Sequence, residues 1–131
     1  MTTLRELLQL PRFSAINLLN SEANLDVAVT SIEITETPDV ALFIPKNVLI
    51  LSTAMVFKDK QEDLIPFIDS LIKANAVGLG IKISRFLKEI DPKVIAYANE
   101  KKFALITIPG AYPLGSLLHQ MQNFLWNSKE E

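Results

Sequence analysis

Short apolar runs alternate with amphipathic segments along most of the chain. Three runs are apolar at nearly every position and show no polar alternation: Val48–Leu51, Val77–Ile81 and Ala104–Ile108. Such runs are typical of parallel strands that are covered on both faces of a sheet. Helical spacing is clearest between the first two runs, in Leu64, Phe67, Ile68, Leu71 and Ile72. The pattern predicts alternating strands and helices, and therefore an α/β fold with a mainly parallel sheet.

The remaining elements are predicted from capping residues, prolines and β-branched runs. Thr3 and Glu6 have the spacing of a capping box and open a short helix that Pro11 ends. Asn75 can adopt the left-handed conformation that closes the helix beginning near Asp63. Further predicted elements are strands at 15–19 and 27–35, short helices after Pro38 and after Ser84, a helix from Asp91-Pro92 to about Lys102, and a helix over 114–127.

Together these elements predict a single three-layer domain over residues 1–131, with a mainly parallel central sheet and helices on both faces. Hydrophobic residues make up 49% of the chain and charged residues 21%, which excludes intrinsic disorder. The longest apolar runs are far shorter than the roughly 20 residues that span a bilayer, and the first residues lack the pattern of a signal peptide. We therefore expect a cytoplasmic protein with no membrane partner.

Composition and charge exclude several kinds of chemistry. The formal net charge of −2 argues against binding nucleic acid by the protein's own field. With no cysteine, the chain has no disulfide, thiolate nucleophile or cysteine zinc site. The single histidine, His119, lacks a second metal ligand at helical spacing. Solvated carboxylates explain Glu33, Glu36, Glu62 and Asp63 better than acid–base catalysis does. We expect no catalytic residue, no metal and no cofactor.

Polar residues follow two of the predicted central strands, at the edge where α/β sheets usually bind ligands. The candidate ligand-binding residues are Ser52, Thr53, Gly78, Gly80, Lys82 and Arg85. Backbone N–H groups beside two cations could hold a phosphate or carboxylate. The segment matches neither a Walker loop nor a dinucleotide fingerprint. The alternative is that the glycines serve packing, the cations are solvated, and the hydroxyls bond local backbone.

The last predicted helix carries an apolar seam. Leu114, Leu118, Met121 and Leu125 are spaced four, three and four residues apart, as in a short coiled coil. This spacing predicts a homodimer with these four residues in the interface. The alternative is that the whole helix packs back on its own sheet.

The order of several segments resembles that of a known family. The segments are residues 3–8 (TLRELL), Val29–Pro38, Leu49–Thr53, Gly78–Lys82, Arg85–Leu87 before Ile90–Pro92, and Leu105-Ile106 through Pro109 before a helix led by Pro113. In this order the chain resembles, from about Thr3 to Leu118, the N-terminal domain of PucR-type regulators, also called the purine catabolism regulatory protein-like family.

The chain departs from the usual pattern of that family mainly where glycine is expected. Lys46-Asn47 replaces a glycine-rich turn before the central strand, and Ala54 replaces a glycine after it. Asn75 stands at a usual glycine after the long helix. Lys102 and Ala104 stand where the family has glycine and proline. Ala54 weakens the case for a tight contact between backbone and ligand after the central strand.

The resemblance implies a non-catalytic, signal-sensing or assembly domain at the front of a bacterial transcription regulator, with purine catabolism as the suggested role. It implies a small-molecule effector, a homodimer, and DNA binding only through a downstream domain that is not present here, because paired helix-turn-helix modules read two half-sites. Residues 127–131 resemble the start of a linker. The alternative is a small enzyme or carrier domain that binds an acidic or phosphorylated substrate at the Gly78–Arg85 edge.

Overall fold

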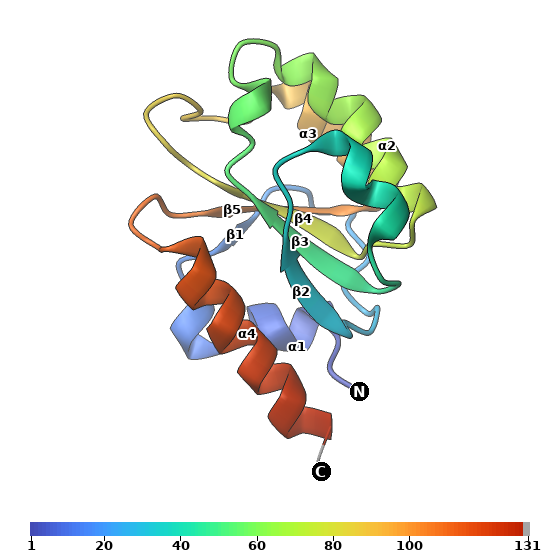
Figure 1. Cartoon of the computed structure of the whole chain (residues 1–131), viewed down its shortest axis with the longest axis vertical. Helices are drawn as coiled ribbons and strands as arrows, with labels where there is room; N and C mark the ends of the chain where they lie inside the picture. The colour runs from blue at the N-terminus through green and yellow to red at the C-terminus, as the bar shows by residue number, and fades with distance from the viewer. Residues whose placement is uncertain (130–131) are drawn as a thin grey trace.

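A mainly parallel β-sheet forms the centre of the protein (Figure 1). The computed structural model describes residues 1–129 and, among these, all side chains except those of residues 40–42 and 128–129. In this part of the chain five strands lie in the spatial order β1-β5-β4-β3-β2. Strands β2 to β5 pair in parallel, and β1 pairs antiparallel with β5. The strands are β1 (Asn17–Leu18), β2 (Ser31–Ile34), β3 (Val48–Ser52), β4 (Gly78–Lys82) and β5 (Ala104–Ile108).

Helices cover both faces of this sheet, which confirms the predicted α/β class (Figure 1). One face carries α2 (Leu64–Lys73), α3 (Pro92–Glu100) and the 3₁₀ helices η2 (Pro38–Phe43), η3 (Met55–Phe57) and η4 (Gln61–Asp63). The other face carries α1 (Leu4–Leu8), the 3₁₀ helix η1 (Pro11–Phe13) and α4 (Leu114–Lys129). Within residues 1–129, every helix is too short or too polar to cross a bilayer.

The two glycines of β4 allow neighbouring strands to pack closely. A Cβ atom on Gly78 would lie 3.0 Å from the carbonyl oxygen of Ala104. A Cβ atom on Gly80 would lie 3.1 Å from side-chain atoms of Leu51 and of Ile108. Neither glycine has a positive φ, so the requirement is for space and not for an unusual backbone conformation.

Two apolar clusters fill the two faces of the sheet. The buried residues of the cluster under α2 and α3 all lie between Val48 and Leu105. The cluster on the α1–α4 face combines sheet residues with residues from distant parts of the chain, among them Leu4, Leu7, Phe13, Leu117, Met121 and Leu125. The α1–α4 face therefore depends on segments that lie on either side of the sheet-forming sequence.

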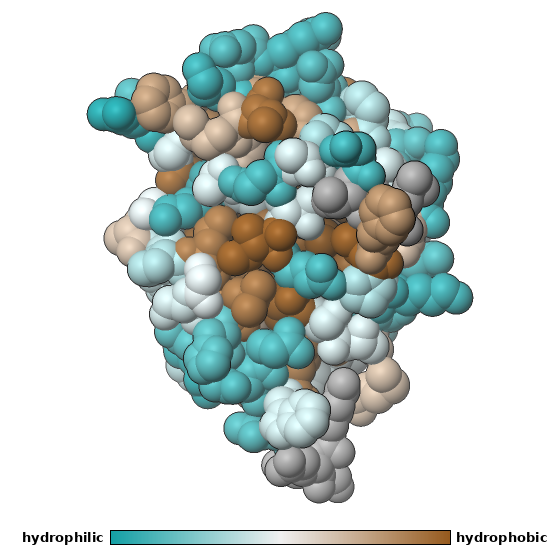
Figure 2. Space-filling view, in the orientation of Figure 1, coloured by the Kyte–Doolittle hydropathy of each residue, from teal (hydrophilic) through white to brown (hydrophobic). Residues whose placement is uncertain are grey.

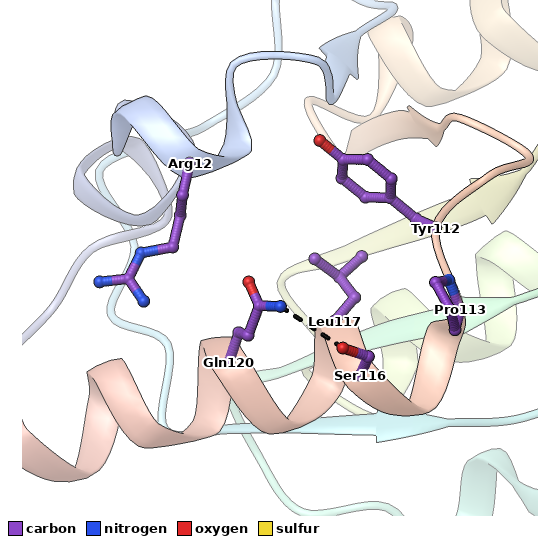
Figure 3. A pocket seen from close by; sticks show the side chains of 6 residues that line it. All are labelled: Arg12, Tyr112, Pro113, Ser116, Leu117 and Gln120. Atoms are coloured by element: carbon purple, nitrogen blue, oxygen red, sulfur yellow. Dashed lines mark hydrogen bonds between the residues drawn. The ribbon is translucent and has the colours of Figure 1, made fainter.

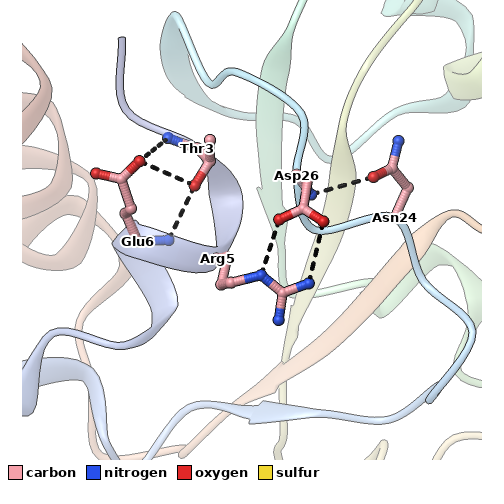
Figure 4. A network of polar contacts seen from close by, with 5 residues as sticks. All are labelled: Thr3, Arg5, Glu6, Asn24 and Asp26. Carbon is pink, nitrogen blue, oxygen red and sulfur yellow. Dashed lines mark hydrogen bonds and ion pairs between the residues drawn. The ribbon is translucent and has the colours of Figure 1, made fainter.

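A capping box and an ion pair hold the start of the chain in place (Figure 4). The Glu6 N–H donates to Thr3 Oγ1 at 3.2 Å, and the Glu6 carboxylate accepts from the Thr3 N–H at 3.3 Å. This reciprocal pair confirms the prediction from their spacing. Arg5 Nε donates to Asp26 Oδ1 at 2.8 Å. The hydrogen-bonded guanidinium lowers the pKa of Asp26, and the carboxylate raises the pKa of Arg5.

Four residues other than glycine have a left-handed backbone within residues 1–129: Asn47 (φ 62°), Ala54 (55°), Asn75 (65°) and Lys102 (57°). These are positions at which the resemblance described above leads us to expect glycine, the residue that adopts this conformation without strain. Asn75 closes α2, as predicted, and Lys102 closes α3. Each is accompanied by the two hydrogen bonds of a Schellman motif.

The prediction of a short helix after Ser84 is wrong. Residues 84–87 form a closed turn, in which Ser84 Oγ accepts hydrogen bonds from the N–H groups of Phe86 and Leu87, each at 3.2 Å. Ser84 and Leu87 also form an isolated β-bridge. Serine side chains compete in this way for backbone donors that a helix would need. Phe86 is 49% exposed, so the segment lacks a continuous buried face.

The predicted strands at 15–19 and 27–35 are shorter in the structure, where they correspond to β1 and β2. Before β2 the chain has a different partner, because Ala28 forms an isolated antiparallel bridge with Thr3. The side chain of Asn47 donates to the Ala28 carbonyl at 2.8 Å. In the sequence, Val27 and Val29 occupy odd positions, whereas Ile32 and Ile34 occupy even positions. The change of partner accounts for this shift in the apolar alternation.

Candidate functional site

The end of β3, which contributes two predicted ligand-binding residues, contacts a carboxylate of the same chain. Ser52 Oγ donates to Glu36 Oε1 at 2.6 Å, and the Thr53 N–H donates to the same oxygen at 2.7 Å. Thr53 Oγ1 donates to the other Glu36 oxygen. Ser52 Oγ also accepts from the N–H of Ala54 at 2.9 Å. Both hydroxyls therefore fasten the turn after β3 to the segment after β2.

The two predicted glycines lie inside the sheet. Gly78 and Gly80 are buried, and β4 has hydrogen-bonded neighbours on both sides. Gly78 also opens β4, whereas Lys82 ends the strand. The structure does not bring the glycines to the edge where a ligand would contact Lys82. This arrangement corresponds to the alternative in which the glycines serve packing.

The two predicted cations lie at the exposed end of β4 and in the turn that follows. Lys82 is half-buried and Arg85 is exposed. The Arg85 guanidinium lies 4.7 Å from the ring centre of Phe86, and Lys58 Nζ lies 5.7 Å from the same centre. In the described part of the chain neither Lys82 nor Arg85 forms an ion pair. An anion site at Lys82 and Arg85 stays a prediction.

A pocket that the sequence did not predict lies between η1 and α4 (Figure 3). Its volume is about 190 Å³. Arg12 reaches it from η1, Tyr112 from the loop after β5, and Leu117 and Gln120 from α4. Figure 3 shows Arg12 and Tyr112 on opposite sides, with the α4 side chains between them.

The pocket combines donors and acceptors of hydrogen bonds. Gln120 Nε2 donates to Ser116 Oγ at 3.4 Å, which leaves the Gln120 carbonyl oxygen free to accept. The guanidinium of Arg12 has several donors and makes no ion pair within residues 1–129, and Figure 3 shows it turned away from Tyr112 at the rim of the pocket. The phenol of Tyr112 can donate or accept. This set suits a small polar molecule that carries carbonyl or carboxylate groups as well as N–H groups.

The four residues predicted for a dimer interface contact the chain's own core. Leu114, Met121 and Leu125 are buried, and Leu118 is half-buried against the same cluster. The arrangement is the alternative considered above, in which the helix packs back on its own sheet. A coiled coil through these residues would require α4 to leave the sheet. The predicted homodimer, with these residues in its interface, stays a prediction.

A cluster of titratable groups joins α2 to α3. Tyr97 Oη donates to Asp69 Oδ1 at 3.1 Å, and Lys73 Nζ lies 2.9 Å from Asp69 Oδ2. The hydrogen bond from Lys73 is the main cause of a lowered pKa at Asp69, and burial is the main cause of a raised pKa at Tyr97. Within residues 1–129, no group of three or more histidine or acidic residues could hold a metal ion.

Comparison with known proteins identifies the family. The model of the purine catabolism regulatory protein-like family, PucR, matches residues 6–125. The chain belongs to this family. A purine catabolism regulatory protein of Bacillus subtilis (strain 168) is 30% identical to this PucR-family chain over 114 residues, which cover 87% of the chain and 22% of that protein. The chain therefore spans about a fifth of the length of that relative.

A solved structure shares the fold of this PucR-family chain. It is the crystal structure of the CBS and DRTGG domains from the regulatory region of Clostridium perfringens pyrophosphatase, in complex with the activator diadenosine tetraphosphate. The TM-score is 0.56 at 15% identity, over 89% of this chain and 45% of that chain. At this identity the likeness concerns the fold alone.

Proposed function

We propose that this chain is the regulatory domain of a bacterial, cytoplasmic PucR-type transcription regulator, and that it binds a small effector. The observation that carries the proposal is the family match over residues 6–125, nearly the whole chain. The name of the Bacillus subtilis relative supports a role in purine catabolism. Much of the length of that relative lies outside the matched part, so DNA binding is assigned to a downstream domain.

We place the effector in the pocket between η1 and α4. A volume of about 190 Å³ is below the roughly 300–1,000 Å³ of pockets for drug-sized ligands, so the effector is a small metabolite. Arg12 would bind a carboxylate or carbonyl oxygen, and Gln120 would accept from an N–H group. Purine breakdown products offer both kinds of group. The pocket also adjoins α4, so an effector could bias the position of that helix toward the rest of the regulator.

A thermal-shift screen of purines, ureides and organic acids tests effector binding. A ligand that binds only the native state raises the free energy of unfolding, by about 2.7 kcal/mol when its concentration is a hundred times its Kd. The melting temperature rises as a result. Arg12→Ala is expected to weaken the hit at least tenfold, and Arg85→Ala is the matched control.

The same pair of variants distinguishes the two candidate sites. If Arg85→Ala abolishes the shift and Arg12→Ala does not, the effector binds at the predicted edge formed by Ser52, Thr53, Lys82 and Arg85. A screen without any rise in melting temperature contradicts effector binding. For a ligand found in the screen, a reporter assay then links binding to regulation. The assay compares transcription driven by the full-length regulator with transcription driven by its Arg12→Ala variant.

Sedimentation of the full-length regulator tests the proposed homodimer. The expected result is a dimer at concentrations at which the described chain alone is a monomer. Leu118→Glu, at the half-buried position of the α4 seam, then tests whether that side of the helix takes part in the dimer. A dimer that survives this change has its interface on another surface.

A further inference from the structure

Strand β2 forms one edge of the sheet, and part of its free side is unoccupied. The N–H of Thr35 donates toward β3, to the Leu51 carbonyl at 3.0 Å. The N–H of Ile32 donates to the opposite side, to Gln122 Oε1 of α4 at 3.0 Å. Successive backbone groups of a strand alternate in direction, so the N–H of Ile34 also faces away from β3. Within residues 1–129 no strand pairs with this side of β2.

Exposed apolar side chains adjoin this edge. Ile34 is 40% exposed and Phe43 is 85% exposed. A hollow of about 330 Å³ lies between the end of β2 and η2, and both side chains line it. Figure 2 shows an apolar area at the centre of the face that contains β2, bordered by hydrophilic residues. An open strand edge beside apolar surface is the combination that proteins normally cover.

The same hollow carries uncompensated negative charge. Glu33 and Glu36 line it, and in the described part of the chain neither forms an ion pair. The Glu36 carboxylate is held by Ser52 and Thr53, whose neutral groups leave its charge in place. The hollow therefore favours a cationic side chain.

We propose that the β2 edge is a docking site for an extended polypeptide segment in which apolar residues alternate with lysine or arginine. The segment adds a strand beside residues 34–36 and bonds the N–H and carbonyl of Ile34. Its apolar side chains lie on the same face of the sheet as Ile34 and contact it, and its cations lie near Glu33 and Glu36. Strand addition of this kind takes affinity from the backbone and specificity from alternate side chains.

Charge disfavours a second copy of the same chain as the occupant. Two β2 edges paired antiparallel around Ile34 would place Glu33 opposite Thr35 of the other copy and Glu36 opposite Ile32, so the four carboxylates of the two copies would lie within five rungs of one ladder. The two Glu33 side chains would be diagonal neighbours on one face of the pair, where like charges repel. A basic segment satisfies the same backbone groups without this repulsion.

A pair of synthetic peptides tests the proposal. The probe is acetyl-Lys-Val-Lys-Val-Lys-Val-amide, and the control replaces each lysine with glutamate. The expected result is a shift of the backbone amide resonances of residues 33–36 and slower hydrogen exchange at the Ile34 amide with the lysine peptide only. Glu33→Lys and Ile34→Pro are each expected to weaken binding at least tenfold. Glu62→Lys makes the same charge change on η4 and is expected to leave binding unchanged.

Several outcomes overturn the proposal. The first is that the lysine peptide causes no shift of the amide resonances of residues 33–36. The second is that both peptides bind equally well. The third is that the Glu33→Lys variant binds the lysine peptide as tightly as the wild type does. If Ile34→Pro does not fold, Glu33→Lys and Glu62→Lys still decide the question. Sedimentation tests whether a second copy of the chain occupies the edge instead. If the wild type is a dimer, and Glu33→Lys strengthens that dimer or Ile34→Pro dissociates it, the β2 edge binds a second copy.

Discussion

Replacing Lys102 with glycine is expected to stabilise the protein, although the change removes a whole side chain. Lys102 has a φ of 57°, which costs an L-residue about 1–2 kcal/mol. Glycine avoids this strain but adds about 0.4–1 kcal/mol of unfolded-state entropy. The Lys102 side chain is exposed and forms no ion pair within residues 1–129, so little else is lost. The expected net gain is about 0.5–1 kcal/mol, or roughly 2–4 °C in melting temperature for a domain of this size.

Urea and thermal unfolding of three variants measure this gain. Lys102→Ala removes the charge and the long side chain but keeps the strained residue, so it should lie close to wild type. Lys101→Gly places glycine one residue earlier, where φ is −87°, and is expected to lose about 0.5–1 kcal/mol. If Lys102→Gly is no more stable than Lys102→Ala, the left-handed backbone is not a source of strain and the reasoning is refuted.

Three further predictions concern the core, α4 and pH. Asn20→Ala leaves two buried backbone groups without their amide partner, at 2.7 and 2.9 Å, and should lower the free energy of unfolding by about 2–4 kcal/mol in urea titrations. Met121→Ala opens a cavity at a fully buried position and should cost about 2–5 kcal/mol, whereas an unchanged stability would mean that α4 does not pack on the sheet. The pKa of Tyr97 is raised in the folded state, so the folded protein holds the phenol proton more tightly than the unfolded chain does. The resulting contribution to the free energy of unfolding is full below the usual tyrosine pKa near 10 and is lost as the pH rises above that value. Tyr97→Phe should reduce this loss between pH 8 and 11, and identical pH profiles would contradict the assignment.

The central strands could be predicted because they are buried on both faces. Their apolar runs match the ends of β3, β4 and β5 within one residue. The segment before β2 could not be predicted in the same way. Its β-branched residues suit an extended backbone in either case, and only tertiary contacts with Thr3 and Asn47 decide which partner Ala28 has.

The candidate site depended on contacts that spacing does not reveal. Ser52 and Thr53 end a strand where ligands often bind, but the position of Glu36 beside them follows from the register of β2 on β3. The pocket of Arg12 and Tyr112 joins distant segments, and no local motif signals it. Apolar spacing in α4 is the same for a helix on its own sheet as for a coiled coil.

The composition of the two apolar clusters has a consequence for the order of folding during synthesis. All buried residues under α2 and α3 have been made once Leu105 has left the ribosome. The opposite face still lacks Leu117, Met121 and Leu125 at that point. Until α4 emerges, a nascent chain therefore presents one finished side of the sheet and one side that only α1 and η1 cover. During this interval the uncovered apolar surface of that side is a target for chaperones and for aggregation, and docking of α4 buries it.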